Sequence, residues 1–225
     1  MKTLKDILEG SLLDDIEDTL SDGDVKVPRA LVLEYLKDNY RGTWIVSKKP
    51  DKDGLYEVSS NENIKVKNTK ITSLTNDLFI WTSVKGNFNC SYCEKLKTLE
   101  GAPEIVKGNF DCVGCNSLKT LEGAPKEIGN SFDCSYCEEL ISLKGSSKEI
   151  KGTFNCSFCN SLKTLDGSPE EVGHDFYCRN CKSLESLDDF PKIIKGDFYC
   201  SNCGKLFTTN DIKKVVLKIK GDIYC

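Results

Sequence analysis

The sequence has few of the residues on which most enzymes depend. It contains a single histidine, His174. A histidine-based catalytic triad would have to use this residue, and no serine or cysteine near it carries a nucleophile motif. A phosphate-binding glycine-rich loop is also missing. We therefore expect a protein without enzymatic activity and without catalytic residues, and we interpret His174 as a polar residue in a turn.

Long apolar runs and an excess of positive charge are absent as well. No run approaches the 18 or more apolar residues of a transmembrane helix. The first twenty residues carry acids where a secretion signal would have its apolar core. The formal net charge is -4, whereas a nucleic-acid-binding protein would offer a basic face. The sequence thus predicts a cytoplasmic protein that is not secreted and has neither a membrane nor a nucleic-acid partner.

Cysteine, by contrast, is abundant and regularly spaced. Twelve of the thirteen cysteines form Cys-x-x-Cys pairs, and successive pairs are 22 residues apart with no insertion or deletion. A phenylalanine precedes each pair by two residues and a leucine follows it by three. The pairs are Cys90 and Cys93, Cys112 and Cys115, Cys134 and Cys137, Cys156 and Cys159, Cys178 and Cys181, and Cys200 and Cys203.

Fixed self-similarity at a period of 20 to 50 residues is typical of stacked repeat proteins, because one unit cannot bury its apolar side alone. We predict a solenoid over 62–225, with a degenerate first unit at 62–83, six units at 84–215 and a terminal strand at 216–225. A step of 22 residues back from Cys90 and Cys93 reaches Asn68 and Ile71, which replace the cysteines in the first unit. Atypical terminal units of this kind close the open ends of a solenoid.

Residues 1–61 precede the repeats and predict a small α+β cap. Apolar residues recur at helical spacing over 3–21 and again from Ala30 to about Asn39, where Pro28 suits the first turn. Short strands are expected at 44–46 and 55–58, on either side of a turn.

The repeat resembles the leucine-rich repeat. Its consensus is V-x-G-x-F-x-C-x-x-C-x-x-L-x-x-L-x-G-x-P, with Phe and the first Cys at the strand positions and the second Cys at the Asn/Cys position. The L-x-G-x-P segment is similar to short bacterial repeats whose outer side is extended chain. The resemblance covers 62–225 and implies a parallel β-sheet with mostly non-helical, extended return segments. In such a coil Phe110 and Cys112 point inward and Asp111 points outward.

Three roles are open to the cysteines. Their spacing fits four-thiolate zinc sites shared by neighbouring pairs, so zinc bound by the twelve paired cysteines is an alternative. Disulfides between coils are geometrically possible, although a chain without a secretion signal predicts free thiols. The third role is core packing, which the flanking Phe and Leu, the apolar Ile71 and the lone Cys225 favour. We therefore predict cysteines that fill a narrow core, with no metal and no cofactor.

The outward positions of the predicted strands vary between units and include residue types that anchor protein interfaces. We predict that they form a face that binds a protein partner. The alternative is that they only solvate and complete the sheet. Acids on this face argue against nucleic-acid phosphate. The predicted binding residues are Tyr92, Asp111, Asp133, Tyr136, Phe158, Tyr177, Arg179 and Tyr199.

Two further resemblances point to bacteriophages. Met1 to Gly10 resembles the capsid-targeting leader of internal head proteins in T-even-like phages, which are cleaved after a glutamate such as Glu9. The Cys-containing units are similar to repeats in uncharacterised proteins of large tailed phages. These resemblances imply a location in the host cytoplasm or the virion. A virion protein processed after Glu9 is therefore an alternative to the interaction module. For the ten residues themselves, the alternative to a leader is that they form the first turns of a cap helix.

Overall fold

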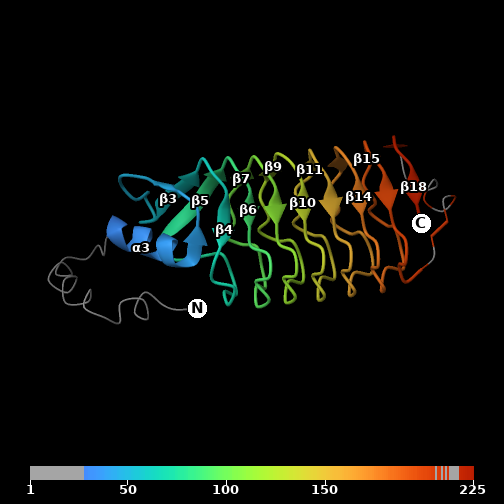
Figure 1. The fold of residues 1–225 in the computed structure, drawn as a ribbon, viewed down its shortest axis with the longest axis horizontal. Helices are drawn as coiled ribbons and strands as arrows, with labels where there is room; N and C mark the ends of the chain where they lie inside the picture. Colours follow the sequence, from blue (N-terminus) through green and yellow to red (C-terminus); the bar gives the residue numbers. More distant parts are fainter. Residues whose placement is uncertain (1–27, 206, 209, 211, 213–217) are drawn as a thin grey trace.

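The computed structural model describes residues 28–205, 207, 208, 210, 212 and 218–225. Over these residues the chain is a parallel β-solenoid of about seven turns with almost no helix (Figure 1). The coils stack along one axis, so that the N-terminal cap and the last strand lie at opposite ends of the molecule. This confirms the predicted repeat solenoid with extended return segments. The helix expected over 3–21 and the Glu9 junction lie outside the described residues.

Each repeat contributes one short strand to each of two nine-stranded sheets. Sheet A faces the viewer in Figure 1 and contains the Phe-bearing strands. Its strands are β1 (Tyr40–Arg41), β4 (Ile64–Val66), β6 (Phe88–Asn89), β8 (Phe110–Asp111), β10 (Phe132–Asp133), β12 (Phe154–Asn155), β14 (Phe176–Tyr177), β16 (Phe198–Tyr199) and β18 (Ile223–Tyr224).

Sheet B was not predicted; its strands, like those of sheet A, are two residues long in the repeats. It forms from the branched aliphatic residue that precedes each unit, as where Val106 pairs with Ile128 of the next coil. Its strands are β2 (Ile45–Val46), β3 (Tyr56–Ser60), β5 (Phe79–Val84), β7 (Ile105–Val106), β9 (Glu127–Ile128), β11 (Glu149–Ile150), β13 (Glu171–Val172), β15 (Ile193–Ile194) and β17 (Lys218–Ile219).

Identical positions of successive repeats lie in register and form ladders through the molecule. Phe132, for example, pairs with Phe110 on one side and with Phe154 on the other. The six phenylalanines at this position are fully buried, and their successive ring centroids are 5.2 to 5.8 Å apart. An unbroken 22-residue step therefore produces a continuous apolar core.

The first coil departs from the register that the sequence predicted. Ile64 pairs with Phe88, so the step is 24 residues, and Val66 takes the position of the first cysteine. Val66 is 3% exposed, whereas Asn68 is exposed to solvent. The assignment of Asn68 and Ile71 to the two cysteine positions was wrong, because two additional residues shift the coil. Since valine cannot bind a metal, the corrected register still favours core packing at this position.

The last coil has the register that the sequence predicted. Ile223 pairs with Phe198, and Tyr224 pairs with Tyr199, at a step of 25 residues. Cys225 follows in the position of the first cysteine of a pair.

The cap closes the N-terminal end of both sheets. Helix α3 (Arg29–Asn39) begins after Pro28 and buries Leu31, Val32 and Leu36. Strand β1 pairs antiparallel with β4, and β2 pairs antiparallel with β3, as the expected hairpin. Strand β3 also pairs parallel with β5, so sheet B is continuous across the predicted boundary at residue 61. These pairings cover sheet edges that would otherwise be open to another chain.

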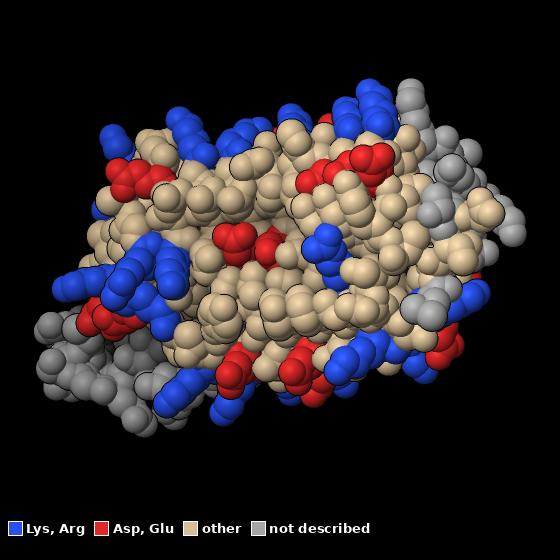
Figure 2. Space-filling view, turned by 45° about the vertical axis from the view of Figure 1, so that its right-hand side comes forward, with Lys and Arg blue, Asp and Glu red and all other residues tan. Residues whose placement is uncertain are grey.

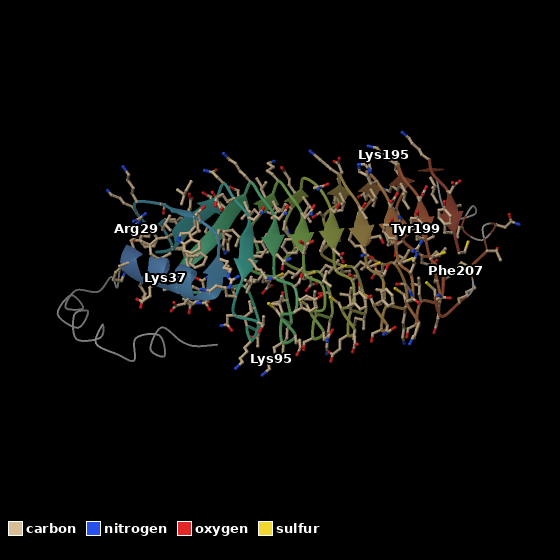
Figure 3. All side chains as sticks on the ribbon, viewed as in Figure 1. Arg29, Lys37, Lys95, Lys195, Tyr199 and Phe207 are labelled. Atoms are coloured by element: carbon tan, nitrogen blue, oxygen red, sulfur yellow. The ribbon has the colours of Figure 1, made fainter. Side chains whose placement is uncertain are left out.

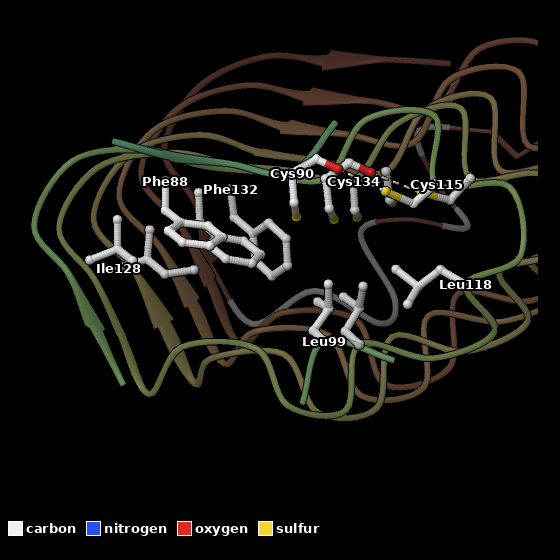
Figure 4. Close-up of a cluster of buried hydrophobic side chains, with 14 of the residues drawn as sticks. Phe88, Cys90, Leu99, Cys115, Leu118, Ile128, Phe132 and Cys134 are labelled. Atoms are coloured by element: carbon white, nitrogen blue, oxygen red, sulfur yellow. Dashed lines mark hydrogen bonds between the residues drawn. The ribbon is translucent and has the colours of Figure 1, made fainter. Parts of the chain in front are cut away.

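The cysteine pairs lie in the core beside the phenylalanines (Figure 4). All twelve are buried and none is more than 9% exposed. In five of the six pairs, the thiol of the second cysteine donates a hydrogen bond to the backbone carbonyl of the first cysteine in the preceding coil. Cys115 donates to Cys90 at 3.3 Å, and Cys203 donates to Cys178 at 3.1 Å. A small side chain that fills the core and carries a weak donor suits this position.

Candidate interaction face on sheet A

The predicted binding residues lie together on the outer side of sheet A. We call this region the sheet A face: the outward side chains of β6 to β18 within sheet A and the turn that follows each strand. Figure 3 shows Tyr199 on this face, with Lys195 and Lys95 at opposite edges of the solenoid. Tyr92 and Tyr136 are 67% and 50% exposed. Partly exposed on the same face are Asp111, Asp133, Phe158, Tyr177, Arg179 and Tyr199.

Two carboxylates occupy neighbouring strands in the middle of the face. Asp111 and Asp133 pair across β8 and β10. The amide of Asn89 donates to Asp111 at 3.4 Å, and the amide of Asn155 donates to Asp133 at 3.1 Å. Neither acid forms an ion pair with a described residue. Burial, and then the charge of Asp133, raise the pKa of Asp111. We call these two residues the acid pair.

Three tyrosines form a stack at the C-terminal end of the same ladder. The ring centroids of Tyr177 and Tyr199 are 4.4 Å apart at 5°, and those of Tyr199 and Tyr224 are 4.6 Å apart at 7°. The hydroxyls of Tyr177 and Tyr199 donate to Asp175 and Asp197, each at 3.0 Å. The hydrogen bond to Asp197 is the main cause of a raised pKa at Tyr199. The rings are therefore held in fixed positions with their edges outward.

Arg179 is a cation without a counterion in the part of the chain that the structure describes. Its guanidinium carbon lies 4.1 Å from the ring centroid of Tyr199 and 5.5 Å from that of Tyr177. Its Nε is buried and has no hydrogen-bond partner, and the side chain forms no ion pair with a described residue. Cation–π contact contributes about 0.5 to 2 kcal/mol, depending on desolvation. The tyrosine stack therefore holds the guanidinium at a defined place on the face.

The turn after each sheet A strand has a left-handed backbone at one position in all six coils. Glycine and asparagine suit this conformation and occur in three of the six coils. The other three have aromatic residues there, and a bulky residue at positive φ is a clear outlier. The φ angles are 62° at Tyr92, 67° at Gly114, 59° at Tyr136, 62° at Phe158, 57° at Asn180 and 58° at Asn202.

Gly114 leaves a gap in this aromatic ladder. A Cβ atom there would lie 3.0 Å from Cδ1 of Tyr92, so the absence of a side chain lets the Tyr92 ring lie against the turn. On the other side, Tyr136 stacks on Phe158 with centroids 4.3 Å apart. The gap is in the same coil as Asp111. Aromatic rings and carboxylates are thus adjacent in this part of the face.

Most other charges gather along the edges of the solenoid. The ion pairs there join lysines to acids of neighbouring coils, as between Lys107 and Glu127 and between Lys195 and Glu171. In Figure 2, acidic atoms lie in a hollow near the middle of one face, with a basic group to one side and largely uncharged surface around them. Charge on the sheet A face is therefore sparse and localised.

Some turn positions of the face are buried. Ser91, Ser135 and Ser157 occupy the turn position of Arg179 in other coils and are 9%, 3% and 6% exposed. Their short side chains lie in the turns between coils, where the Ser157 hydroxyl accepts a hydrogen bond from the Arg179 amide at 3.2 Å. Tyr224 was not among the predicted binding residues, although the repeat of the strand pattern at Ile223 could have revealed it.

His174 and the paired cysteines are the residues on which catalysis or metal binding would depend. His174 lies at an exposed corner, where its backbone amide donates to Gly152. Among the described residues, no group of three or more His, Cys, Asp and Glu is placed to hold a metal ion. Burial raises the pKa of the Cys134 thiol well above its ordinary value, whereas hydrogen bonds with Cys90 and Cys178 lower the pKa of Cys115 and of Cys203. Because metals bind the thiolate, the environment of Cys134 favours a neutral core thiol at that position.

No family model, curated protein or solved structure matches the chain. The resemblances to leucine-rich repeats and to phage repeats therefore stay predictions. In the part of the chain that the structure describes, no helix has the length and apolar character needed to cross a membrane.

Proposed function

We propose that the protein is a non-enzymatic interaction module whose sheet A face binds a protein partner. Extended sheet surfaces are the usual binding surfaces of solenoids. Five of the eight tyrosines lie on this face, together with Arg179, and both residue types are common among the residues that dominate interface energetics. The proposal requires no cofactor. Twelve buried cysteines without a disulfide support a reducing compartment such as the cytoplasm.

The aromatic residues at left-handed positions are the observation that carries the proposal. A left-handed backbone costs a non-glycine residue about 1 to 2 kcal/mol. A stacked aromatic pair returns about 0.5 to 1.5 kcal/mol, so the contact between Tyr136 and Phe158 does not offset the cost at both positions. Tyr92 is 67% exposed and stacks on no described ring. Stability alone therefore does not account for these residues, while strained backbone is typical of functional sites.

The test compares the proteins captured by the wild-type chain and by a face variant. The face variant combines Tyr92→Asn, Tyr136→Asn and Phe158→Asn, because asparagine already occupies this position at Asn180 and Asn202. The chains are crosslinked in the cells that produce them, and the captured proteins are identified by mass spectrometry. We expect a partner that the wild type recovers and the face variant loses. Recovery of the same proteins by the face variant would contradict the proposal.

A matched control changes charge away from the face. Glu127→Gln and Glu171→Gln remove acids from strands of sheet B and should leave capture of the partner unchanged. Thermal unfolding of the face variant provides the second control. Asparagine relieves the backbone cost, so we expect a variant at least as stable as the wild type. A strong loss of stability in the variant would instead show that these rings stabilise the fold by packing.

A further inference from the structure

We propose that the sheet A face binds an extended segment of a protein partner, which places a basic side chain over Asp111 and Asp133 and an acidic side chain over Arg179. This inference rests on the proposed function and specifies the chemistry of the partner. Its basis is charge complementarity: both charged groups of the face lack an opposite charge among the described residues. Complementary charge sets the register and specificity of an interface.

The basic side chain belongs over the acid pair. Asp111 and Asp133 are adjacent like charges, and among the described residues their only side-chain hydrogen-bond donors are the neutral amides of Asn89 and Asn155. A guanidinium or ammonium group there would neutralise the repulsion between them. Tyr92 adds an aromatic ring near the acid pair, because its ring lies beside Gly114, which follows Asp111 in the same coil. Cations bind favourably over such rings.

The acidic side chain belongs over Arg179. The guanidinium is already held against the rings of Tyr199 and Tyr177, so little conformational entropy remains to be lost on binding. A carboxylate matches the planar donors of arginine in a bidentate geometry. The neighbouring tyrosine hydroxyls already donate to Asp175 and Asp197, which leaves Arg179 as the charged donor for an incoming acid.

The separation of the two charged sites indicates an extended segment. The acid pair spans β8 and β10, and the Arg179 guanidinium lies beside the stacked rings of β14 and β16, nearer to that of β16, so the two sites are about three strand spacings apart. At about 4.8 Å per strand this is about 14 Å, which equals roughly four residues of extended chain at about 3.4 Å each. A partner segment that runs along the solenoid axis thus meets both sites with charges about four residues apart.

The same features disfavour a nucleic acid. A phosphate backbone would meet the acid pair, and Arg179 is the one cation among the outward strand residues of β6 to β18 and the turn residues equivalent to Ser91 and Tyr92. Binding of nucleic acids depends on several lysines or arginines that neutralise phosphates together. A segment with charges of both signs fits both sites at once.

Binding of synthetic peptides to the full chain tests the inference directly. A matched-spacing peptide carries Arg and Glu about four residues apart in a Ser/Thr background. A short-spacing peptide carries them about half as far apart, and a neutral peptide carries Gln at both places. Fluorescence anisotropy measures the affinity of each labelled peptide at low salt, and a single-stranded DNA oligonucleotide is measured alongside. We expect the matched-spacing peptide to bind about tenfold tighter than the other probes.

Variants taken from the repeat itself locate the contacts. Asp111→Asn with Asp133→Asn reproduces the residues found at Asn89 and Asn155, and Arg179→Ser reproduces those at Ser157 and Ser201. Each change should weaken the matched-spacing peptide about tenfold and leave the neutral peptide unaffected. Thermal unfolding confirms that the variants are folded.

The outcomes separate this inference from the proposed function. Equal affinity of the three peptides, or a matched-spacing peptide insensitive to the charge variants, overturns the inference. Tighter binding of the oligonucleotide overturns it as well. If the Tyr92, Tyr136 and Phe158 variant still loses its cellular partner, the sheet A face remains a binding surface with another chemistry. If that variant retains its partners, the proposed function fails independently.

Discussion

At the scale of single residues, one ladder position carries different chemistry in different coils while the core position beside it does not change. The outward ladder of sheet A runs through Asn89, Asp111, Asp133, Asn155, Tyr177, Tyr199 and Tyr224. The neighbouring core ladder is phenylalanine in all six repeats and isoleucine in both end coils. Variation at one position and constancy at the next support the proposal that the function lies outside the core.

The substitution Asp111→Asn should stabilise the protein at neutral pH. It removes a charge that is half-buried beside Asp133, and like charges on neighbouring strands cost up to about 1 kcal/mol. The folded state holds the pKa of Asp111 above its unfolded value of about 3.9. The destabilisation is therefore present at neutral pH and is relieved as the pH falls through the raised pKa.

Denaturant unfolding of Asp111→Asn and the wild type, measured between neutral pH and about pH 4, checks this expectation. The free energies of unfolding should differ most at neutral pH and converge toward the acidic end. Glu127→Gln is the control, because Lys107 lowers the pKa of that exposed acid and the opposite pH trend is expected. A gain in the free energy of unfolding of Asp111→Asn over the wild type that grows as the pH falls would contradict the interpretation.

At the scale of the elements, each coil is joined to the next by strand pairing, and successive Cys-x-x-Cys coils are joined by the thiol hydrogen bond as well. The Cys137 thiol donates to the carbonyl of Cys112 at 3.3 Å, and both residues are fully buried. This bond gives the cysteines a role within the solenoid that involves no metal. It also explains why a residue with both small volume and a donor recurs there.

The substitution Cys137→Ala should therefore destabilise the protein by about 1 to 2 kcal/mol, from a lost thiol and a lost hydrogen bond. Chelation should have no effect on the unfolding temperature. Calorimetry of the wild type and of Cys137→Ala, both purified with a reducing agent, measures the loss of stability. Calorimetry of the wild type with and without EDTA measures the effect of chelation. Zinc found by elemental analysis, together with a lower unfolding temperature after chelation, would show instead that the cysteines bind metal.

Much of the repeat could be predicted from the sequence, because a 22-residue step fixes which residues share a ladder. The inward Phe110 and Cys112, the outward Asp111 and the extra residues before Ile223 all follow from it. The first coil could not be placed by the same step. Pairing of Ile64 with Phe88 depends on how the chain leaves the cap, which is a tertiary property.

The candidate site was predictable as a set of residues but not as an arrangement. The stacking of Arg179 on Tyr199 and the left-handed backbone at Tyr92 depend on the shape of the turn after each strand. The Cys-x-x-Cys motif indicates chemistry at the sulfur atoms, and the thiol-to-carbonyl hydrogen bond appears only when neighbouring coils are placed side by side. Short-range patterns thus identified the positions, while coil packing determined their geometry.

At the scale of the whole molecule, the solenoid is a linear stack in which each coil contacts its neighbours, so its ends are its weakest parts. The cap counters this at the N-terminal end. Leu36 is fully buried on α3, and Tyr40 lies 5.4 Å from Trp81 and 6.5 Å from Phe88 between ring centroids. Packing of the cap therefore supports the first coils directly.

The substitution Leu36→Ala should destabilise the protein by about 2 to 5 kcal/mol, the usual cost of such a cavity. The loss should be local, because coupling in a stack passes from one coil to the next. Hydrogen exchange followed by mass spectrometry should show faster exchange in β4 and β6 and little change in β12 and β14. Uniformly faster exchange along the whole chain would mean that the solenoid unfolds as one unit.

The constant step within the repeats also affects how the molecule can change in evolution. Every internal unit starts and ends at the same point of the coil, so duplication or deletion of one 22-residue unit creates no new junction in the core. A unit gained between β10 and β14 would move Asp133 and Arg179 apart by one strand spacing, about 4.8 Å, and leave both side chains in their present surroundings. Gene duplication can thus adjust the length of the sheet A face in fixed increments, and a protein engineer can do the same.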